Sequence, residues 1–151
     1  MNPEISIVGY NDTYKQGLLS TWELAVLATH QFLAKEDFIA IKEILWQINF
    51  NELNVHCLMH QQKVVGFIGL ADAKIEMLFV LPEYMGFGLG KRLIQFAIAQ
   101  FNASKVDVNE QNENAVLFYK KMGFEVLERT NNDDQGRPYP LLRMKLKNPL
   151  Q

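Results

Sequence analysis

The amino-acid sequence predicts an α/β (α+β) fold, with a mixed, mostly antiparallel central sheet of about seven strands and helices on both faces. Two observations predict the fold class. Apolar residues recur with a period of two in some segments and of 3.6 in others, and the segments follow one another in the order β-α-α-β-β-β-α-β-α-β-β. A third concerns organisation: the chain has 151 residues, with no repeat, low-complexity tract or linker. One domain spanning residues 1–151 is therefore expected.

The first third of the chain is expected to form one strand and two helices. Residues 4–8 alternate as a short strand, and Asn11 or Asp12 can cap the helix that follows. On that helix an apolar stripe recurs every four residues and ends on the polar ring of His30. The second helix is marked by apolar residues spaced three and four apart, which are Phe38, Ile41, Leu45 and Ile48.

The middle of the chain is expected to form three strands. Residues 53–60 alternate between apolar and polar side chains, with Leu53 on the apolar face. A polar turn at residues 61–63 then leads into an apolar run at 64–70, so these two strands form a hairpin. A further strand covers the next apolar segment, residues 74–81.

The last third of the chain alternates between helices and strands. A helix with one apolar face is predicted over residues 89–101, followed by a short strand at 105–108. Residues 115–122 fit a further helix, and Gly123 stands where a left-handed cap is expected. Two strands around a turn close the fold, at residues 124–129 and 141–146.

Composition and charge restrict the class of protein. A hydrophobic share of 48% and a charged share of 21% are ordinary for globular chains. The net charge of −2 offers no general attraction, so neither nucleic acid nor membrane is expected as a partner. The first residues lack the pattern of a signal peptide, and the apolar stretch at 64–71 is far shorter than the roughly 20 residues of a membrane span. A cytoplasmic protein is therefore expected.

No metal site is expected either. Cys57 is the single cysteine, which excludes an internal disulfide and cysteine-based zinc sites. It is in phase with Val55 and Met59 and so fits a small buried apolar residue. His56 and His60 lie on one face of a strand about 13 Å apart, too far to share a metal ion.

The segment most informative about chemistry is residues 75–93, where an apolar strand runs through a glycine-rich turn directly into an amphipathic helix. Gly86, Gly88 and Gly90 let the backbone adopt positive φ and approach a ligand closely. The first N–H groups of a helix lack internal partners and carry the positive end of its dipole, so this turn can bind phosphate. The spacing fits neither a P-loop nor a dinucleotide fingerprint. A flexible connection without a ligand is the alternative for this segment alone.

A second motif follows some twenty residues later, and the pair resembles the GNAT superfamily of acyl-CoA-dependent N-acyltransferases. The family's first motif is Arg or Gln, two free positions, Gly, one free position, then Gly or Ala. Gly88 and Gly90 match it, but Met85 stands at the Arg/Gln position. The second motif, Asn-x-x-Ala-x-x-Phe-Tyr-x-x-x-Gly-Phe, is matched throughout by Asn112, Ala115, Phe118, Tyr119, Gly123 and Phe124.

The resemblance covers nearly the whole chain, because the predicted order of elements is also that of the family. Two further stretches resemble a small bacterial subgroup of single-domain N-acetyltransferases. They are A-T-H-Q-F-L at residues 28–33 and R-P-Y-P-L-L at residues 137–142.

The resemblance implies acetyl-CoA as the acyl donor. Its pyrophosphate would bind the backbone of residues 86–91, and its pantetheine arm would lie beside the strand at 78–80, where the sheet splays between Val80 and Val108. The implied cofactor-binding residues are Leu78, Phe79, Val80, Gly86, Phe87, Gly88, Leu89, Gly90, Lys91, Asn112 and Phe118. Met85 in place of Arg removes one charged contact but leaves the backbone site, so it bears on affinity more than on the binding mode. Four basic residues either meet the other phosphates or are solvated helix charges, namely Lys91, Arg92, Lys120 and Lys121.

The resemblance also implies an N-acetyltransferase that transfers acetyl to a primary amine by direct attack within a ternary complex. Tyr119 would be the general acid to the CoA thiolate, although a tyrosine on an apolar stripe also fits a core role. A backbone N–H of residues 78–80 would stabilise the oxyanion. Glu76 and His30 are the catalytic candidates on the acceptor side, and Tyr139 is expected to line the same cavity. Three alternatives stay open: Glu76 faces solvent, His30 is a core residue, or the base acts through water or is absent.

The expected partners are acetyl-CoA and an amine acceptor, which is either a small molecule or a protein N-terminal or lysine amine. A monomer or a homodimer is expected. One alternative is a non-catalytic acyl-CoA sensor or scaffold on the same fold. Another is a nucleotide-phosphate binder, for which ATP would compete as well as CoA.

Overall fold

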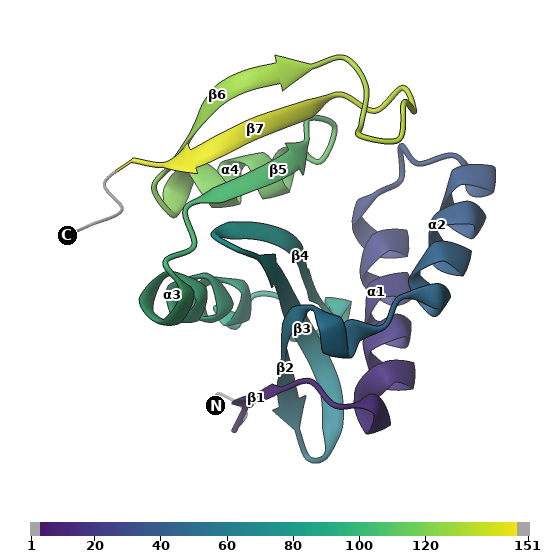
Figure 1. Cartoon of the computed structure of the whole chain (residues 1–151), viewed down its shortest axis with the longest axis vertical. Helices are drawn as coiled ribbons and strands as arrows, with labels where there is room; N and C mark the ends of the chain where they lie inside the picture. Colours follow the sequence, from purple (N-terminus) through teal and green to yellow (C-terminus); the bar gives the residue numbers. More distant parts are fainter. Residues whose placement is uncertain (1–3, 148–151) are drawn as a thin grey trace.

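The computed structural model of the protein describes residues 4–147 and confirms a seven-stranded, mostly antiparallel sheet with helices on both faces (Figure 1). Residues 1–3, part of the segment judged for a signal peptide, and residues 148–151, the end of the predicted 1–151 domain, lie outside the described residues. The strands are β1 (Ser6–Gly9), β2 (Asn54–His60), β3 (Lys63–Ala71), β4 (Lys74–Val80), β5 (Lys105–Asn109), β6 (Phe124–Thr130) and β7 (Leu141–Leu146). The α-helices are α1 (Lys15–Thr29), α2 (Lys35–Gln47), α3 (Leu89–Phe101) and α4 (Glu113–Lys121). Short 3-10 turns add η1 (Asp12–Tyr14), η2 (Phe50–Glu52) and η3 (Pro82–Tyr84).

The sheet has the strand order β1-β2-β3-β4-β5-β7-β6, and β4 and β5 are its parallel neighbours. Their pairing covers two positions, Lys74 with Lys105 and Ile75 with Val106. Beyond these positions the two strands diverge, as Figure 1 shows near the middle of the molecule. The resemblance implies such a splay, and we call this opening the fork.

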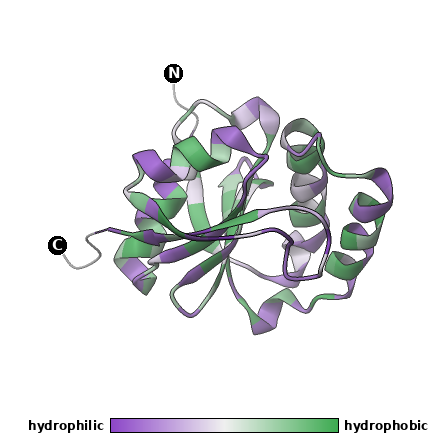
Figure 2. Ribbon diagram, turned by 90° about the horizontal axis from the view of Figure 1, so that it is seen from above, coloured by the Kyte–Doolittle hydropathy of each residue, from purple (hydrophilic) through white to green (hydrophobic). Residues whose placement is uncertain are grey.

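Two hydrophobic clusters hold the helices on opposite faces of the sheet. The cluster on one face includes Leu93 and Ile94 of α3 and Tyr119 of α4, packed on apolar residues of the central strands. The other includes Trp22 of α1 and Leu45 of α2. In Figure 2 the flanking helices carry both apolar (green) and hydrophilic (purple) residues, as expected of helices with one buried face. The fork therefore lies between a face covered by α3 and α4 and a face covered by α1 and α2.

Two local predictions are wrong, and each has a physical reason. Leu53 is 41% exposed because it is the C-cap of η2, and β2 begins one residue later. Asn11 caps η1 rather than α1, since its side chain accepts the hydrogen bond of the Thr13 N–H. The helix α1 itself begins directly after Tyr14, whose side chain makes no capping hydrogen bond within the described residues.

The residues considered for metal binding are buried or contact aromatic rings. Cys57 is fully buried, and this burial raises its pKa to about 12. The imidazole of His56 lies 5.0 Å from the ring of Phe96 and 5.1 Å from that of Phe101, while His60 contacts Tyr84. Within residues 4–147 no three His, Cys, Asp or Glu side chains are grouped to hold a metal ion. None of the described helices combines the length and apolarity that crossing a bilayer requires.

Gly66 sets how closely β4 packs on β3, which leads to a prediction. A Cβ at Gly66 would lie 2.7 Å from Leu58 Cδ1 and 3.0 Å from the carbonyl oxygen of Phe79, whereas a Cβ at Gly9 would meet nothing within 4 Å. We expect Gly66→Ala to lower the free energy of unfolding by about 1–3 kcal/mol. Gly9→Ala, the matched control, should change it by less than about 0.5 kcal/mol. Urea unfolding measures both, and equal losses would contradict this packing.

Candidate active site

A cavity of about 390 Å³ opens beside the fork on the face covered by α3 and α4. We call it the larger cavity. It is lined by the glycine turn, β4 and α4, including the predicted cofactor residues Leu78, Val80, Gly86, Gly88, Leu89, Gly90, Lys91, Asn112 and Phe118. Met85 also lines it, so an apolar side chain stands where the family motif has Arg or Gln. The Phe87 side chain is 46% exposed and lines neither this cavity nor the next, which leaves its main chain as the predicted contact.

A second cavity of about 170 Å³ lies in the fork itself. We call it the smaller cavity. His30, Glu76 and Phe79 line it together with Asp107 of β5. Four residues line both cavities, namely Leu78, Asn112, Ala115 and Tyr119. The two cavities therefore meet at the fork, and a ligand in one can contact a ligand in the other.

The turn before α3 presents an unusual run of free backbone donors. None of the six N–H groups of residues 86–91 donates to an acceptor among the described residues, and the first backbone bond of α3 runs from Arg92 N–H to Gly88 O. Gly86 and Gly88 have φ of 89° and 75°, and a Cβ at either would meet nothing within 4 Å. Glycine is needed at these two positions for the backbone conformation. With the helix dipole, these donors form a site suited to a phosphate group.

Gly90 is required for a different reason. A Cβ there would lie 3.3 Å from Cζ of Phe118, so the first turn of α3 packs directly against α4. Lys91 lines the larger cavity, and Arg92, Lys120 and Lys121 are exposed. None of these four basic residues forms an ion pair with the part of the chain that the structure describes. They remain available to anionic groups.

Tyr119 occupies the junction of the two cavities. Its side chain is 6% exposed, and its ring lies 5.2 Å from that of Phe118 and 5.6 Å from that of Phe124. Its hydroxyl makes no hydrogen bond to residues 4–147, yet no polar side-chain atom in that range is both fully buried and unpartnered. The hydroxyl must therefore reach the cavity surface. Burial raises the pKa of the phenol, which keeps it protonated and able to donate at neutral pH.

Asn112 acts first as a helix cap. Its side-chain oxygen accepts a hydrogen bond of 3.3 Å from the Ala115 N–H at the start of α4. The side-chain amide nitrogen is not used by this cap, so the predicted contact of Asn112 with the cofactor stays a prediction.

His30 directly follows Thr29, the last residue of α1, in the sequence. Its ring centroid lies 5.2 Å from that of Phe32 and 6.4 Å from that of Phe79, and its Nδ1 lies 2.8 Å from Thr29 Oγ1. Burial lowers the pKa of the imidazole below 6.5. His30 is therefore neutral at pH 7 and has a nitrogen lone pair.

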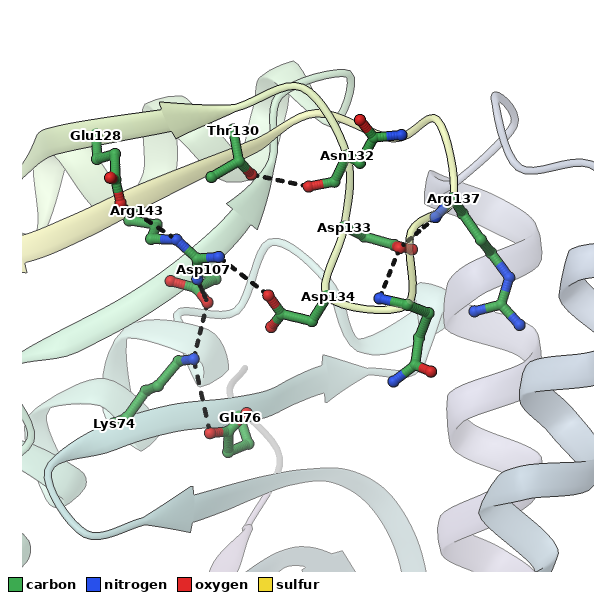
Figure 3. Close-up of polar contacts among 11 residues, drawn as sticks. Lys74, Glu76, Asp107, Glu128, Thr130, Asn132, Asp133, Asp134, Arg137 and Arg143 are labelled. Carbon is green, nitrogen blue, oxygen red and sulfur yellow. Dashed lines mark hydrogen bonds and ion pairs between the residues drawn. The ribbon is translucent and has the colours of Figure 1, made fainter.

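Glu76 stands at a β-bulge of β4, where pairing with β3 passes from Met77 to Ile75. Its side chain is 46% exposed, so it faces solvent and the smaller cavity together. Lys74 Nζ lies 3.8 Å from the carboxylate of Glu76 and 2.7 Å from that of Asp107 (Figure 3). A guanidinium nitrogen of Arg143 lies 2.6 Å from the same Asp107 oxygen. Asp107 is thus neutralised by two cations, which leaves Glu76 as the less compensated carboxylate.

Tyr139 does not line either cavity, which corrects the expectation. Its hydroxyl accepts a hydrogen bond of 2.9 Å from the Ala34 N–H and donates one to Asp37, at the start of α2. Its ring packs edge-on against Phe32 at 6.0 Å. These bonds hold Tyr139 against the start of α2 and so link the loop between β6 and β7 to that helix.

Comparison with known proteins decides the family. Residues 25–147 match the family described as the acetyltransferase (GNAT) domain. The chain belongs to the GNAT family. It is 37% identical over 127 residues to the peptidyl-lysine N-acetyltransferase YjaB of Salmonella typhimurium, covering 84% of this chain and 88% of the relative. The same enzyme of Escherichia coli is 35% identical over 127 residues, covering 84% and 86%.

Solved structures agree with this assignment. The solution structure of apo-form YjaB from Escherichia coli superimposes with a TM-score of 0.86 at 34% identity, covering 94% of this chain and 97% of that one. The PaiA N-acetyltransferase of Thermoplasma acidophilum, solved in complex with coenzyme A, shares the fold with a TM-score of 0.75 at 21% identity, covering 95% and 99%. The predictions of the GNAT fold, of an N-acetyltransferase and of acetyl-CoA as its donor are confirmed at the level of the family.

The glycine turn leads to a prediction about coenzyme A affinity. Gly88 and Gly136 have φ of 75° and 80°, and a Cβ at either would meet no atom within 4 Å. Both Gly→Ala variants should lose about 1–2 kcal/mol of stability, because both force alanine into the left-handed region. Of the two variants, only Gly88→Ala is expected to weaken the binding of coenzyme A, by about tenfold, a change of about 1.4 kcal/mol. Calorimetric titration measures this, and an equal effect of both variants would contradict the role of the turn.

Proposed function

We propose that the protein transfers the acetyl group of acetyl-CoA directly to a primary amine while both substrates are bound, with Tyr119 as the general acid. The observation that carries this proposal is the position of Tyr119, which lines both cavities with a hydroxyl free of partners among the described residues. A donor in the larger cavity and an acceptor in the smaller one would meet at this hydroxyl.

The larger cavity fits the donor. The six free N–H groups of residues 86–91 suit a diphosphate, and the cavity beside them has room for its phosphates because Gly86 and Gly88 carry no side chain. Beyond Ile75, the edge of β4 that faces β5 has no strand partner among residues 4–147, so its main-chain groups can pair with the amides of the pantetheine arm. Acetyl-CoA would thus supply a thioester at the fork.

Direct transfer is favoured over an acetyl-enzyme intermediate. The single cysteine, Cys57, is fully buried and packs with α1 and α2, and its raised pKa keeps it as an unreactive thiol. No other thiol is present in the sequence to accept the acetyl group. The amine nitrogen would therefore attack the thioester carbon itself.

The residues at the fork match the charge changes of this attack. As the C–N bond forms, a backbone N–H of residues 78–80 can stabilise the negative oxygen. As the C–S bond breaks, the Tyr119 phenol can give its proton to the sulfur. The apolar surroundings that raise the pKa of Tyr119 disfavour a thiolate there as well, so both groups shift in the same direction.

The acceptor would be a lysine side chain of a peptide or protein. The relatives YjaB are named for peptidyl-lysine, and the smaller cavity combines features that suit a lysine. Glu76 can bind the ammonium group, while Phe79 offers an aromatic face to the methylene chain. Two groups on this wall can accept the amine's proton, namely Glu76 and His30.

Substitution of Tyr119 tests the proposed function. With acetyl-CoA and lysine peptides, wild-type protein should release free CoA thiol, and peptides with a blocked lysine should release none. Tyr119→Phe should lower kcat by about 10² because the sulfur loses its proton donor, while acetyl-CoA binding is kept. Tyr10→Phe, which removes a hydroxyl bonded to Asp12 away from the cavities, is the matched control and should keep full activity. Unchanged kcat in Tyr119→Phe would remove the phenol from the mechanism.

A further inference from the structure

We propose that Thr29 is a positioning residue that holds His30 in the tautomer protonated at Nδ1, which leaves Nε2 as the proton acceptor for the amine substrate. The inference rests on the proposed function and assigns its base. It follows from a count of hydrogen-bond donors at the end of α1.

The hydroxyl of Thr29 makes two short contacts but has only one proton to donate. Its Oγ1 lies 2.8 Å from the carbonyl oxygen of Ala25 and 2.8 Å from Nδ1 of His30. A carbonyl oxygen can only accept, so the Thr29 proton must point to Ala25 if that contact is a hydrogen bond. The second contact is then a hydrogen bond only when Nδ1 of His30 carries a proton and donates it to Oγ1. The neutral imidazole therefore has its lone pair on Nε2.

The helix fixes the direction of this relay, by which we mean the two hydrogen bonds from His30 to Thr29 and from Thr29 to the Ala25 carbonyl. Thr29 is the last residue of α1, and a threonine hydroxyl bonded to the carbonyl four residues earlier is a regular helical conformation. Ala25 is 2% exposed, so the carbonyl end of the relay lies on a buried part of the helix. The His30 ring is further restrained by contacts with Phe32 and Phe79.

The free nitrogen of His30 has access to a ligand. No hydrogen bond to Nε2 is formed within residues 4–147, and the ring lines the smaller cavity. That cavity is also lined by Tyr119, a buried residue whose hydroxyl has no partner among the described residues, which marks the place where the reacting groups would meet. Thr29 lines the larger cavity, so the pair Thr29–His30 lies at the boundary between donor and acceptor.

The charged and titratable groups around His30 come from four other elements. Glu76 of β4, Asp107 of β5 and Tyr119 of α4 line the smaller cavity together with His30, and Lys35 of α2 lines a further cavity with it. Asp107 is compensated by Lys74 and Arg143 as described above. Burial is the cause that lowers the pKa of His30, so Nε2 is unprotonated at neutral pH and can accept a proton.

The proton balance is complete with these groups. The substrate ammonium gives one proton to Nε2 of His30, and the resulting amine attacks the thioester carbon. The sulfur leaves with the proton of Tyr119, and the second proton on the nitrogen restores the phenol, directly or through water. The imidazolium returns its proton to solvent before the next turnover.

Nitrogen NMR of the histidine ring tests the tautomer without any activity. The chain has three histidines, so comparison with His30→Asn assigns the His30 signals. Above pH 7 we expect protonated Nδ1 and bare Nε2 in wild-type protein and in Thr29→Ser, which keeps the hydroxyl. Thr29→Val is nearly isosteric but has no acceptor for Nδ1–H, and it should lose this preference. A wild-type ring protonated at Nε2, or an unchanged tautomer in Thr29→Val, would overturn the proposal.

Kinetics test the consequence for catalysis. Thr29→Val should lower kcat about tenfold with little change in KM for acetyl-CoA, and Thr29→Ser should restore it. The wild-type kcat should fall as the pH drops through the lowered pKa of His30, since the imidazole is then protonated. His30→Asn should lose about 100-fold in kcat and lack this acid limb. An unchanged kcat and acid limb in His30→Asn would exclude His30 as the base. Failure of the wild-type protein to acetylate any amine would instead contradict the proposed function, while the NMR result would still decide the tautomer.

Discussion

The short parallel pairing of β4 and β5 is the constraint on which the site depends. Two register positions join the strands, and beyond them the sheet opens between its own central members. An opening inside a sheet exposes main-chain groups that are normally paired, and it gives access from both faces. The helices that follow β4 and β5, α3 and α4, both begin near this opening and bring the glycine turn and Tyr119 to it.

The larger cavity and the fork differ in chemistry, and this difference would separate the donor from the acceptor in the proposed reaction. On the face of α3 and α4, free amides and unpaired basic side chains suit an anionic ligand. In the fork itself, Glu76 suits a cation, whereas Asp107 is already paired with Lys74 and Arg143 across β4, β5 and β7 (Figure 3). Because these four charged residues sit on strands, their positions are set by the packed sheet rather than by loops.

Local patterns in the sequence were sufficient for the order of elements and for much of the larger cavity. The glycine turn is one continuous motif in the sequence, and Asn112 and Phe118 belong to another, so both can be recognised without the structure. The fold brings the two motifs together around the larger cavity. The rest depends on tertiary structure. Glu76 lines the fork because a bulge redirects it, and Leu53 is exposed because a 3-10 turn precedes β2. Tyr139 was expected in the cavity, but its partner Asp37 is 102 residues away, and no periodicity reveals such a pair.

The coenzyme A site that we propose is formed by the fork and the amides of residues 86–91. Amide NMR spectra recorded during a titration with coenzyme A test it most directly. We expect the largest shifts at residues 86–91 and on the fork edge of β4 at residues 78–80, with smaller changes on α2. Saturable binding that leaves the amides of 86–91 unmoved would contradict it.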